Sequence, residues 1–387
     1  MTPTHPLPSA ATRPERDASI CWDAPLEALY RRIVSADGFL SQYREALQAA
    51  GNCCETGVTP CLKAPVALPV GQHWLWKLEN QTATGAFKIR GALVAMHQAM
   101  SSLAPGQRHF FASSTGNHAL AVLHAASLLG VDSVTLVLPE TVVADKQAKL
   151  AGRVAALNNQ TGQSAARMVL HGQTVEAAHA HAARLAETAR QVTGGGVFVH
   201  PFADPAVVAG QGTIGLEMVR QLTDYLVAES LNPADFDELL VVSAIGGGGL
   251  LSGAATGVVG ALRENPALEH LRPRFLGLQL ASLNSRLGDA VRVAAPDGEN
   301  LRRLDALGVV RMTMDDDAMA AGMQAVENGF NTWVEGPAGA TVQAVLTGEP
   351  QNRPAARRLV ISLLSGGNVD LSVLSGFIPV SQGAVAG

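Results

Sequence analysis

The sequence predicts an α/β protein with two parallel, twisted sheets flanked by helices. Short apolar runs alternate with longer helical segments between residues 73 and 363. This alternation is typical of parallel sheets covered by helices on both faces. A chain of 387 residues with 47% hydrophobic and 16% charged side chains can build a large core or two domains.

The N-terminal part is predicted to be a tail, a helical region and a loop. Residues 1–20 read as a flexible polar tail. Apolar side chains at helical spacing predict helix between Ala24 and Ala50, with a break near Asp37 and Gly38. Residues 57–71, rich in Pro and Gly, then lead to a strand at 73–79.

The remaining elements follow from the period of the apolar residues. Strands are predicted at 108–112, 133–138, 167–170, 196–199, 238–243, 274–280 and 358–363. Helices are predicted at 87–100, 116–129, 144–157, 175–192, 207–226 and 250–263. The small and polar residues 152–166 read as a long surface loop, either a tolerated insertion or a functional segment.

Composition excludes several classes of function. The net charge is −5, which argues against nucleic acid as a partner. The four cysteines form no Cys-x-x-Cys pair and predict neither a zinc site nor a disulfide framework. No apolar signal region and no membrane-spanning run are found, so we expect no membrane partner and a cytoplasmic location.

Lys88 is the first candidate for chemistry. It lies in Thr84–Gly91, a loop that follows a strand and begins a helix. The positive end of the helix dipole disfavours a cation at this position. Such a lysine is either solvated or held neutral for covalent chemistry with a carbonyl group.

The second candidate is the segment Ser113–Ala119, between a strand and an apolar helix. Ligands bind at the carboxyl ends of parallel strands, and helix-start amides hold anions. The alternative is an ordinary polar helix cap. We expect His118 to take a supporting position. The expected substrate contacts are Ser113, Ser114, Thr115, Gly116, Asn117 and His118.

The third candidate is the run Gly246–Gly249 between a strand and a helix. Four glycines leave backbone amides free to hold a phosphate, or they form a plain tight turn. The Gly-x-Gly-x-x-Gly pattern fails in every frame, which disfavours a nicotinamide oxidoreductase. Ser365, at the end of another strand, could face a buried heteroatom or belong to a turn.

These loops, taken in order, resemble the fold-type II pyridoxal-phosphate enzymes, and within them the serine/threonine dehydratases. The resemblance runs from about Thr59 to Asp370 and also includes the stretches 200–205, 210–217, 335–340 and 365–368. It implies a tryptophan synthase β-like fold. It also implies a large cofactor-binding domain from residues 21–107 and 203–387, and a small mobile substrate domain from residues 108–202.

The resemblance also implies a role for each residue. Lys88 would bond to pyridoxal 5'-phosphate and act as the base at Cα, and Phe87 would pack on the ring. Asn117 would hydrogen-bond the phenolic oxygen, and Ser365 would face the ring nitrogen. Glu335 would lie near the cofactor. The phosphate would be held by amides of Gly246, Gly247, Gly248, Gly249 and Leu250.

The sequence departs from the family pattern in three features, and these limit which family properties we expect here. Gln279 stands where related enzymes with a divalent cation have Glu, so we expect no metal. Thr115 stands where racemases of the family have a serine and simple dehydratases usually have alanine, so racemisation is an open alternative. The sequence ends at Gly387, so we expect no C-terminal regulatory domain of the kind found in biosynthetic threonine deaminases.

The leading hypothesis is an ammonia-lyase that converts a 3-hydroxy amino acid, threonine or serine, to a 2-oxo acid and ammonia. The alternative substrates are 3-hydroxyaspartate, phenylserine and diaminopropionate. Amino-acid racemase is the second hypothesis, with Thr115 as an added catalytic residue. A cofactor-binding protein without turnover is the third, and a homodimer is expected by analogy.

Overall fold

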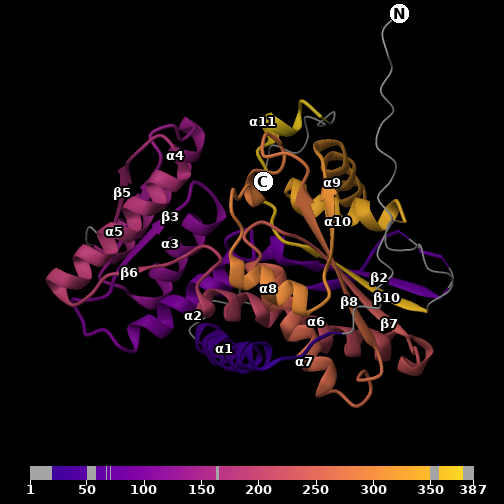
Figure 1. The fold of residues 1–387 in the computed structure, drawn as a ribbon. Helices are drawn as coiled ribbons and strands as arrows, with labels where there is room; N and C mark the ends of the chain where they lie inside the picture. Colours follow the sequence, from indigo (N-terminus) through magenta and orange to yellow (C-terminus); the bar gives the residue numbers. More distant parts are fainter. Residues whose placement is uncertain are drawn as a thin grey trace, which may run out of the picture.

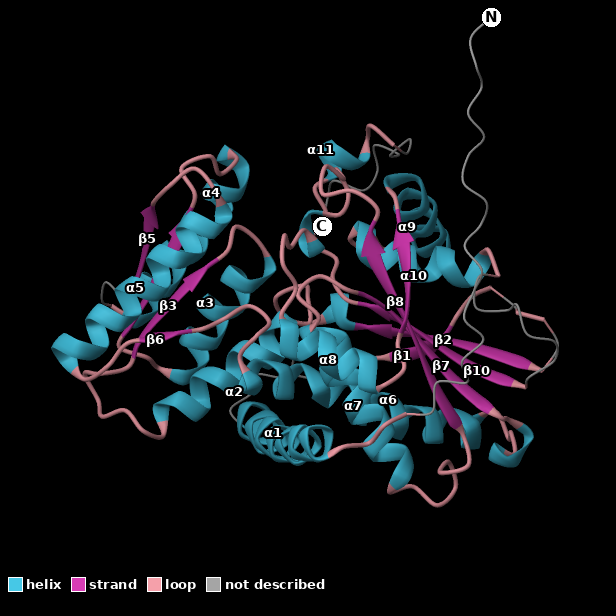
Figure 2. Cartoon of the chain, in the orientation of Figure 1, coloured by secondary structure: helices cyan, strands magenta, loops and turns pink. Residues whose placement is uncertain are grey.

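The computed structural model contains two parallel-stranded sheets, each covered by helices (Figures 1 and 2). It describes residues 20–49, 58–66, 68–69, 71–162, 165–348 and 357–377. The predicted tail, apart from its last residue, lies outside these ranges, as do Cys53 and Cys54. No helix within the described ranges combines the length and apolarity that crossing a bilayer requires.

The larger sheet has the strand order β1-β2-β10-β7-β8-β9. Its strands are β1 (Cys61–Lys63), β2 (Gln72–Leu78), β7 (Glu238–Ala244), β8 (Arg272–Leu280), β9 (Val310–Met314) and β10 (Arg358–Leu364). Among these described strands, only the β1–β2 pair is antiparallel. The central strands β7 and β10 are buried along their whole length, as expected for a sheet covered on both faces.

The smaller sheet is entirely parallel, with the order β5-β4-β3-β6. Its strands are β3 (His109–Ser113), β4 (Ser133–Leu138), β5 (Ala166–Leu170) and β6 (Val197–Phe198). Three helices belong to it: α3 (Asn117–Leu129), α4 (Ala144–Thr161) and α5 (Val175–Thr193). In Figure 1 this unit lies to the left of the larger sheet.

Helices cover the larger sheet on both faces. One face carries α6 (Pro205–Ala228) and α7 (Gly249–Arg263), with α1 (Ala24–Ala49) packed outside them. The other carries α9 (Asp316–Phe330) and α10 (Gly336–Leu346), which bury Trp74 and Trp76. The remaining short elements are η1 (Glu79–Gln81), η2 (Pro233–Asp235), η3 (Asp289–Val291), α8 (Gly298–Ala306) and α11 (Leu371–Leu374).

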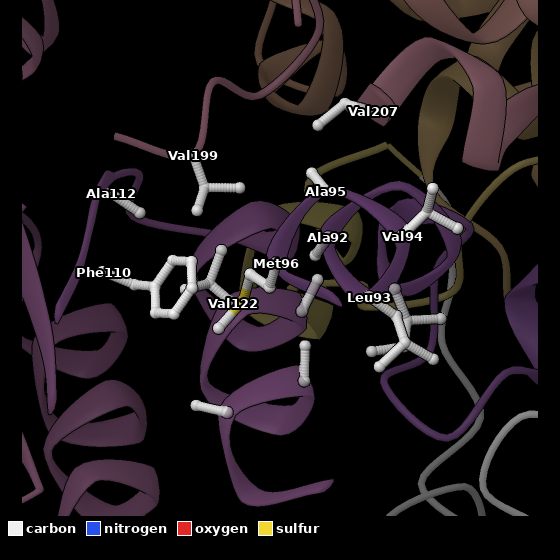
Figure 3. Close-up of a cluster of buried hydrophobic side chains, with 14 of the residues drawn as sticks. Ala92, Leu93, Val94, Ala95, Met96, Phe110, Ala112, Val122, Val199 and Val207 are labelled. Carbon is white, nitrogen blue, oxygen red and sulfur yellow. The ribbon is translucent and has the colours of Figure 1, made fainter. Parts of the chain in front are cut away.

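Helix α2 (Lys88–Met100) joins the two sheets. It packs against α6 of the larger unit and against α3 of the smaller one. Figure 3 shows Leu93 and Met96 of α2 in one apolar cluster with Phe110 of β3 and Val207 of α6. Because this shared core fixes α2, the first residue of the helix, Lys88, is held between the two sheets.

Two predictions were wrong. The helix does not break at Gly38, because Ile33, Ala36 and Leu40 on either side are buried, and this packing outweighs the low helix propensity of glycine. Residues 152–166 are not a long loop, since α4 continues to Thr161. Leu157 is buried, and the Asn158 side chain bonds both backbone groups of Ala166, which fastens the helix end to β5.

Candidate active site

The carboxyl ends of β7 and β10 define one edge of the larger sheet. The two strands are parallel neighbours, and Ser362 lies opposite Val242. The chain therefore leaves β7 into the four glycines and leaves β10 into Ser365 at the same edge. This is the place where open parallel sheets bind ligands.

The glycine run 246–249 forms a tight cup against Phe202. A Cβ atom on Gly247 would lie 2.1 Å from the Phe202 ring, and one on Gly249 would lie 2.6 Å from the Phe202 carbonyl oxygen. The buried Asn300 side chain donates to the carbonyl oxygens of Phe202 (2.8 Å) and Gly247 (3.3 Å). Glycine is therefore required at these positions by the close approach of the neighbouring chain.

The cup presents free hydrogen-bond donors. Within the described ranges, the backbone N–H groups of Gly246, Gly247 and Gly248 have no acceptor. Gly248 has a φ of 87° and precedes α7, so these amides lie at a helix N-terminus. Such a concavity suits a phosphate, because amides and the helix dipole both favour an anion there.

Lys88 lies close to this cup. Its ammonium nitrogen donates to the carbonyl oxygen of Pro201 at 2.8 Å and lies 5.0 Å from the ring centroid of Phe87. Phe202, which follows Pro201 in the chain, contacts the glycine cup. Desolvation lowers the pKa of Lys88 from 10.5 to about 8, and the nearby Glu335 carboxylate partly opposes this change.

The loop after β3 lies at the carboxyl edge of the smaller sheet. Ser113 ends the strand and is buried, and the Ser114 hydroxyl accepts a hydrogen bond from the Gly116 amide at 3.1 Å. Gly116 is the N-cap of α3, and Thr115 precedes it. The His118 ring is buried, with Nε2 2.8 Å from the Val199 carbonyl oxygen, and desolvation lowers its pKa to about 3.

Asn117 and Glu335 are brought together from distant parts of the chain. The Asn117 amide nitrogen donates to both carboxylate oxygens of Glu335, at 2.8 and 3.0 Å. Its carbonyl oxygen accepts from Asn368 at 2.8 Å, so the orientation of the amide is fixed at both ends. A Cβ on Gly366 would lie 2.4 Å from Glu335, which explains the glycine there.

The environment of Glu335 favours its neutral form. Burial raises the pKa of this carboxyl group from 4.5 to about 7, although the hydrogen bond from Asn117 opposes the change. Ser365 is also buried, and its carbonyl oxygen accepts from the Phe87 amide at 3.1 Å. Asn117 and Glu335 are therefore linked directly by hydrogen bonds. Lys88 is linked to Ser365 through the amide of its neighbour Phe87.

Helix α4 of the smaller sheet reaches the larger unit beside this site. Lys146 pairs with Asp289 of η3, and the Lys149 ammonium lies 3.5 Å from the Asn368 amide oxygen. No sequence pattern indicated these contacts, since α4 and η3 are far apart in the chain. The roles of Phe202, Asn300 and Asn368 were missed for the same reason, although 200–205 and 365–368 were noted as motifs.

Gln279 is the second-to-last residue of β8. No group of three or more His, Cys, Asp or Glu side chains suited to a metal occurs among the residues that the structure describes. The loop after β8 is held by Asp316, which accepts from the Ser285 hydroxyl (2.5 Å) and from the amides of Arg286 (2.9 Å) and Leu287 (3.2 Å).

Fold and site together define a class of enzyme with a lysine and a phosphate cup placed between two parallel α/β units. The family model described as "Pyridoxal-phosphate dependent enzyme" matches residues 55–366. The chain belongs to this family, and its fold is that of the fold-type II members. The absence of the Gly-x-Gly-x-x-Gly pattern from the glycine run 246–249 agrees with this assignment.

Curated relatives and solved structures place the chain near the threonine and serine ammonia-lyases. It is 34% identical over 329 residues to the L-threonine ammonia-lyase of Geobacter sulfurreducens, covering 80% of this chain and 70% of that one. It is 28% identical over 313 residues to the catabolic L-threonine dehydratase TdcB of Staphylococcus aureus (strain USA300), covering 78% and 81%.

Two solved structures show the same architecture. The threonine deaminase of T.th. superimposes with a TM-score of 0.60 at 26% identity, covering 89% of this chain and 98% of that one. Maize serine racemase superimposes with a TM-score of 0.63 at 22% identity, covering 87% and 95%, and this likeness concerns the fold. The chain is thus a pyridoxal-phosphate-dependent enzyme homologous to threonine ammonia-lyases.

Proposed function

We propose that the chain converts L-threonine, or L-serine, to the corresponding 2-oxo acid and ammonia. The observation that carries the proposal is the Lys88 amine, whose pKa is lowered to about 8 beside a cup of free backbone amides. A substantial fraction of this amine is neutral at pH 8, as a base must be. The 34% identity to an L-threonine ammonia-lyase supports this choice of substrate.

The residues present fit pyridoxal 5'-phosphate. The amides of Gly246–Leu250 would hold its phosphate, Lys88 would carry its aldehyde carbon, and Ser365 would face its ring nitrogen. When bound, the cofactor supplies a conjugated ring that stabilises the negative charge left by loss of the Cα proton. The hydroxyl of Ser365 is neutral, so it does not force a proton onto the ring nitrogen.

The protein's own groups would bind the substrate and move its protons. The hydroxyls of Ser114 and Thr115 and the amides at the start of α3 would hold the substrate carboxylate. Lys88, once released from the cofactor by the substrate amine, would accept the Cα proton. The β-hydroxyl leaves as water and one water is added back, so threonine becomes 2-oxobutanoate and ammonia without an oxidant.

We also propose that residues 108–202 act as the mobile substrate domain. The Lys146–Asp289 pair and the Lys149–Asn368 contact join helix α4 to the larger unit beside Asn117. A substrate carboxylate bound at Ser114 and Thr115 would draw the same unit toward Lys88. Closure of this kind excludes water from the reacting atoms.

The test is a substrate panel with the purified, cofactor-loaded enzyme. We expect 2-oxo acid from L-threonine or L-serine, and loss of this product in Lys88→Ala. Lys63→Ala is the matched control, because Lys63 is an exposed lysine paired with Glu229. No 2-oxo acid from threonine, serine, 3-hydroxyaspartate, phenylserine or diaminopropionate would refute the proposal.

Amino-acid racemisation is the second candidate, and Thr115 favours it. Thr115 lies in the loop after β3, next to the N-cap Gly116 of α3. We propose that its hydroxyl returns a proton to the face of Cα opposite Lys88. Chiral analysis of recovered substrate measures this activity. Thr115→Ala should remove racemisation and retain elimination, whereas equal loss of both activities would argue against a separate role for the hydroxyl.

A further inference from the structure

A short segment, residues 200–204, joins β6 of the smaller unit to α6 of the larger one. Two of its residues meet the candidate site. The carbonyl oxygen of Pro201 accepts from the Lys88 ammonium group at 2.8 Å, and the Phe202 ring lies where a Cβ on Gly247 would be 2.1 Å away. The placement of this segment therefore fixes how the Lys88 amine lies relative to the glycine cup.

The first residue of the segment, His200, holds its backbone. The ring nitrogen Nδ1 accepts from the amide of Phe202 at 3.2 Å and from the amide of Ala203 at 2.9 Å. Because both partners are donors, Nδ1 carries no proton, and the neutral ring has its proton on Nε2. Neither amide donates to a backbone oxygen within the described ranges. The His200 ring is thus the acceptor that satisfies this turn.

Three aromatic rings surround the His200 ring edge to face. Its centroid lies 4.9 Å from that of His179, 6.0 Å from that of Phe198 and 4.7 Å from that of Phe202. The first two belong to α5 and β6, so the smaller unit sets the orientation of the ring. Desolvation and His179 lower the pKa of His200 to about 4, although Asp297 opposes the change. Nδ1 therefore stays free to accept at neutral pH.

The other side of the Phe202 backbone is held from the larger unit. Its carbonyl oxygen accepts from the buried Asn300 amide at 2.8 Å, and the same nitrogen lies 3.3 Å from the carbonyl oxygen of Gly247. The N–H of Phe202 is fixed by His200 and its C=O by Asn300. Both hydrogen-bonding groups of this residue are thus paired to side chains, one from each end of the site.

We propose that His200 is a positioning residue for the cofactor site and acts through its acceptor nitrogen. Without this acceptor, the two amides of the turn would be unpaired in a half-buried position, and the turn would open to reach water. That change would carry the Pro201 carbonyl group away from Lys88 and the Phe202 ring away from the glycine cup. The inference depends on the cofactor of the family and not on the proposed substrate or reaction.

The test is the dissociation constant of pyridoxal 5'-phosphate, measured as its release from the holoenzyme on dilution. His200→Phe keeps an aromatic ring and removes the acceptor. His200→Asn removes the ring and keeps an oxygen bonded to Cγ, as Nδ1 is, and such a side chain accepts from amides two and three residues further on. The matched control is His179→Phe, because His179 lies in the same ring cluster and has no side-chain hydrogen bond to a described residue.

We expect His200→Phe to bind the cofactor at least about tenfold more weakly than the wild type, because two amides lose their acceptor. His200→Asn and His179→Phe should stay within about threefold, because both keep the two hydrogen bonds of the turn. Thermal unfolding of the cofactor-free variants checks that each is folded. If His200→Phe does not fold, His200→Gln takes its place, since its amide is one methylene too far away, and the same weakening is expected.

Three results would overturn the proposal. The first is cofactor binding by His200→Phe that equals that of the wild type. The second is His200→Asn that binds as weakly as His200→Phe, which would show that ring packing and not the acceptor matters. The third is equal weakening by His179→Phe, which would indicate a general effect of the ring cluster. Each dissociation constant is measured without substrate, so failure of the proposed reaction stays distinguishable.

Discussion

Replacing Glu335 by glutamine should change how the stability of the cofactor-free protein depends on pH. Burial raises the pKa of this carboxyl group from 4.5 to about 7. Between these values the folded protein keeps the proton and the unfolded chain has lost it. The free energy of unfolding therefore falls as pH rises through this window, and the loss is complete above the folded pKa.

The size of the effect follows from the pKa change. Each pKa unit corresponds to about 1.4 kcal/mol, so ionised Glu335 costs the folded protein up to about 3 kcal/mol at pH 8. Glutamine at the same position cannot ionise, and it keeps an oxygen that can accept from Asn117. Glu335→Gln should therefore gain stability relative to the wild type between pH 5 and pH 8.

The assay is urea unfolding of both proteins at the two pH values. Contributions of groups that do not interact with Glu335 cancel in the difference between variant and wild type, to first approximation. Glu140→Gln is the control, because Glu140 is exposed and bonds the exposed Gln173 side chain. An equal stability difference at pH 5 and pH 8 for Glu335→Gln would refute the assignment of a protonated, desolvated carboxyl group.

Three further predictions follow from the described contacts. The rate of elimination should rise with pH up to about 8 as Lys88 loses its proton, and a flat profile from pH 6 to 9 would contradict its role as base. Arg90→Met should lower the free energy of unfolding by about 3–5 kcal/mol in urea titrations, because Glu79 and Glu217 lose their buried partner. Chelator treatment should leave the rate unchanged, since Gln279 offers a neutral amide in place of a carboxylate, and restoration of a lost rate by Mg²⁺ or Ca²⁺ would contradict this.

The central strands and the site loops could be predicted because their signals are local. β4 begins and ends at the predicted residues, and the ends of β7, β8 and β10 differ from the prediction by at most two residues. Buried parallel strands read as continuous apolar runs. After β7 and β10 the chain enters glycine and serine residues at the edge where parallel sheets bind ligands. The glycine cup and the Lys88 loop could be predicted from the sequence for this reason.

Other features depended on tertiary contacts that no local pattern encodes. The short strands β1 and β9 have exposed residues and lie at the edges of the sheet, so they lack a strong apolar run. The last turns of α4 are small and polar, and a single buried leucine with the Asn158 contacts to β5 stabilises them. The division of the chain into a cofactor-binding and a substrate domain stays a prediction, as does the role of each site residue.

The buried ion cluster explains how α2 can hold its first residue in place. Arg90 forms paired hydrogen bonds with Glu79 and with Glu217, all between 2.7 and 2.8 Å. Burial alone would raise the pKa of Glu217, but Arg90 and Lys77 outweigh it and lower that pKa. Glu217 therefore stays ionised, and its paired hydrogen bonds, together with those of Glu79, keep the guanidinium in one orientation.

The rotation of α2 about its own axis then follows from the helix geometry. Residues two positions apart in an α-helix point about 200° apart, at 3.6 residues per turn. When Arg90 is fixed in the ion cluster, Lys88 must point to the opposite side, where it meets Pro201 beside the glycine cup. A buried cluster that adds little net stability can thus be retained because it sets the direction of the reactive amine.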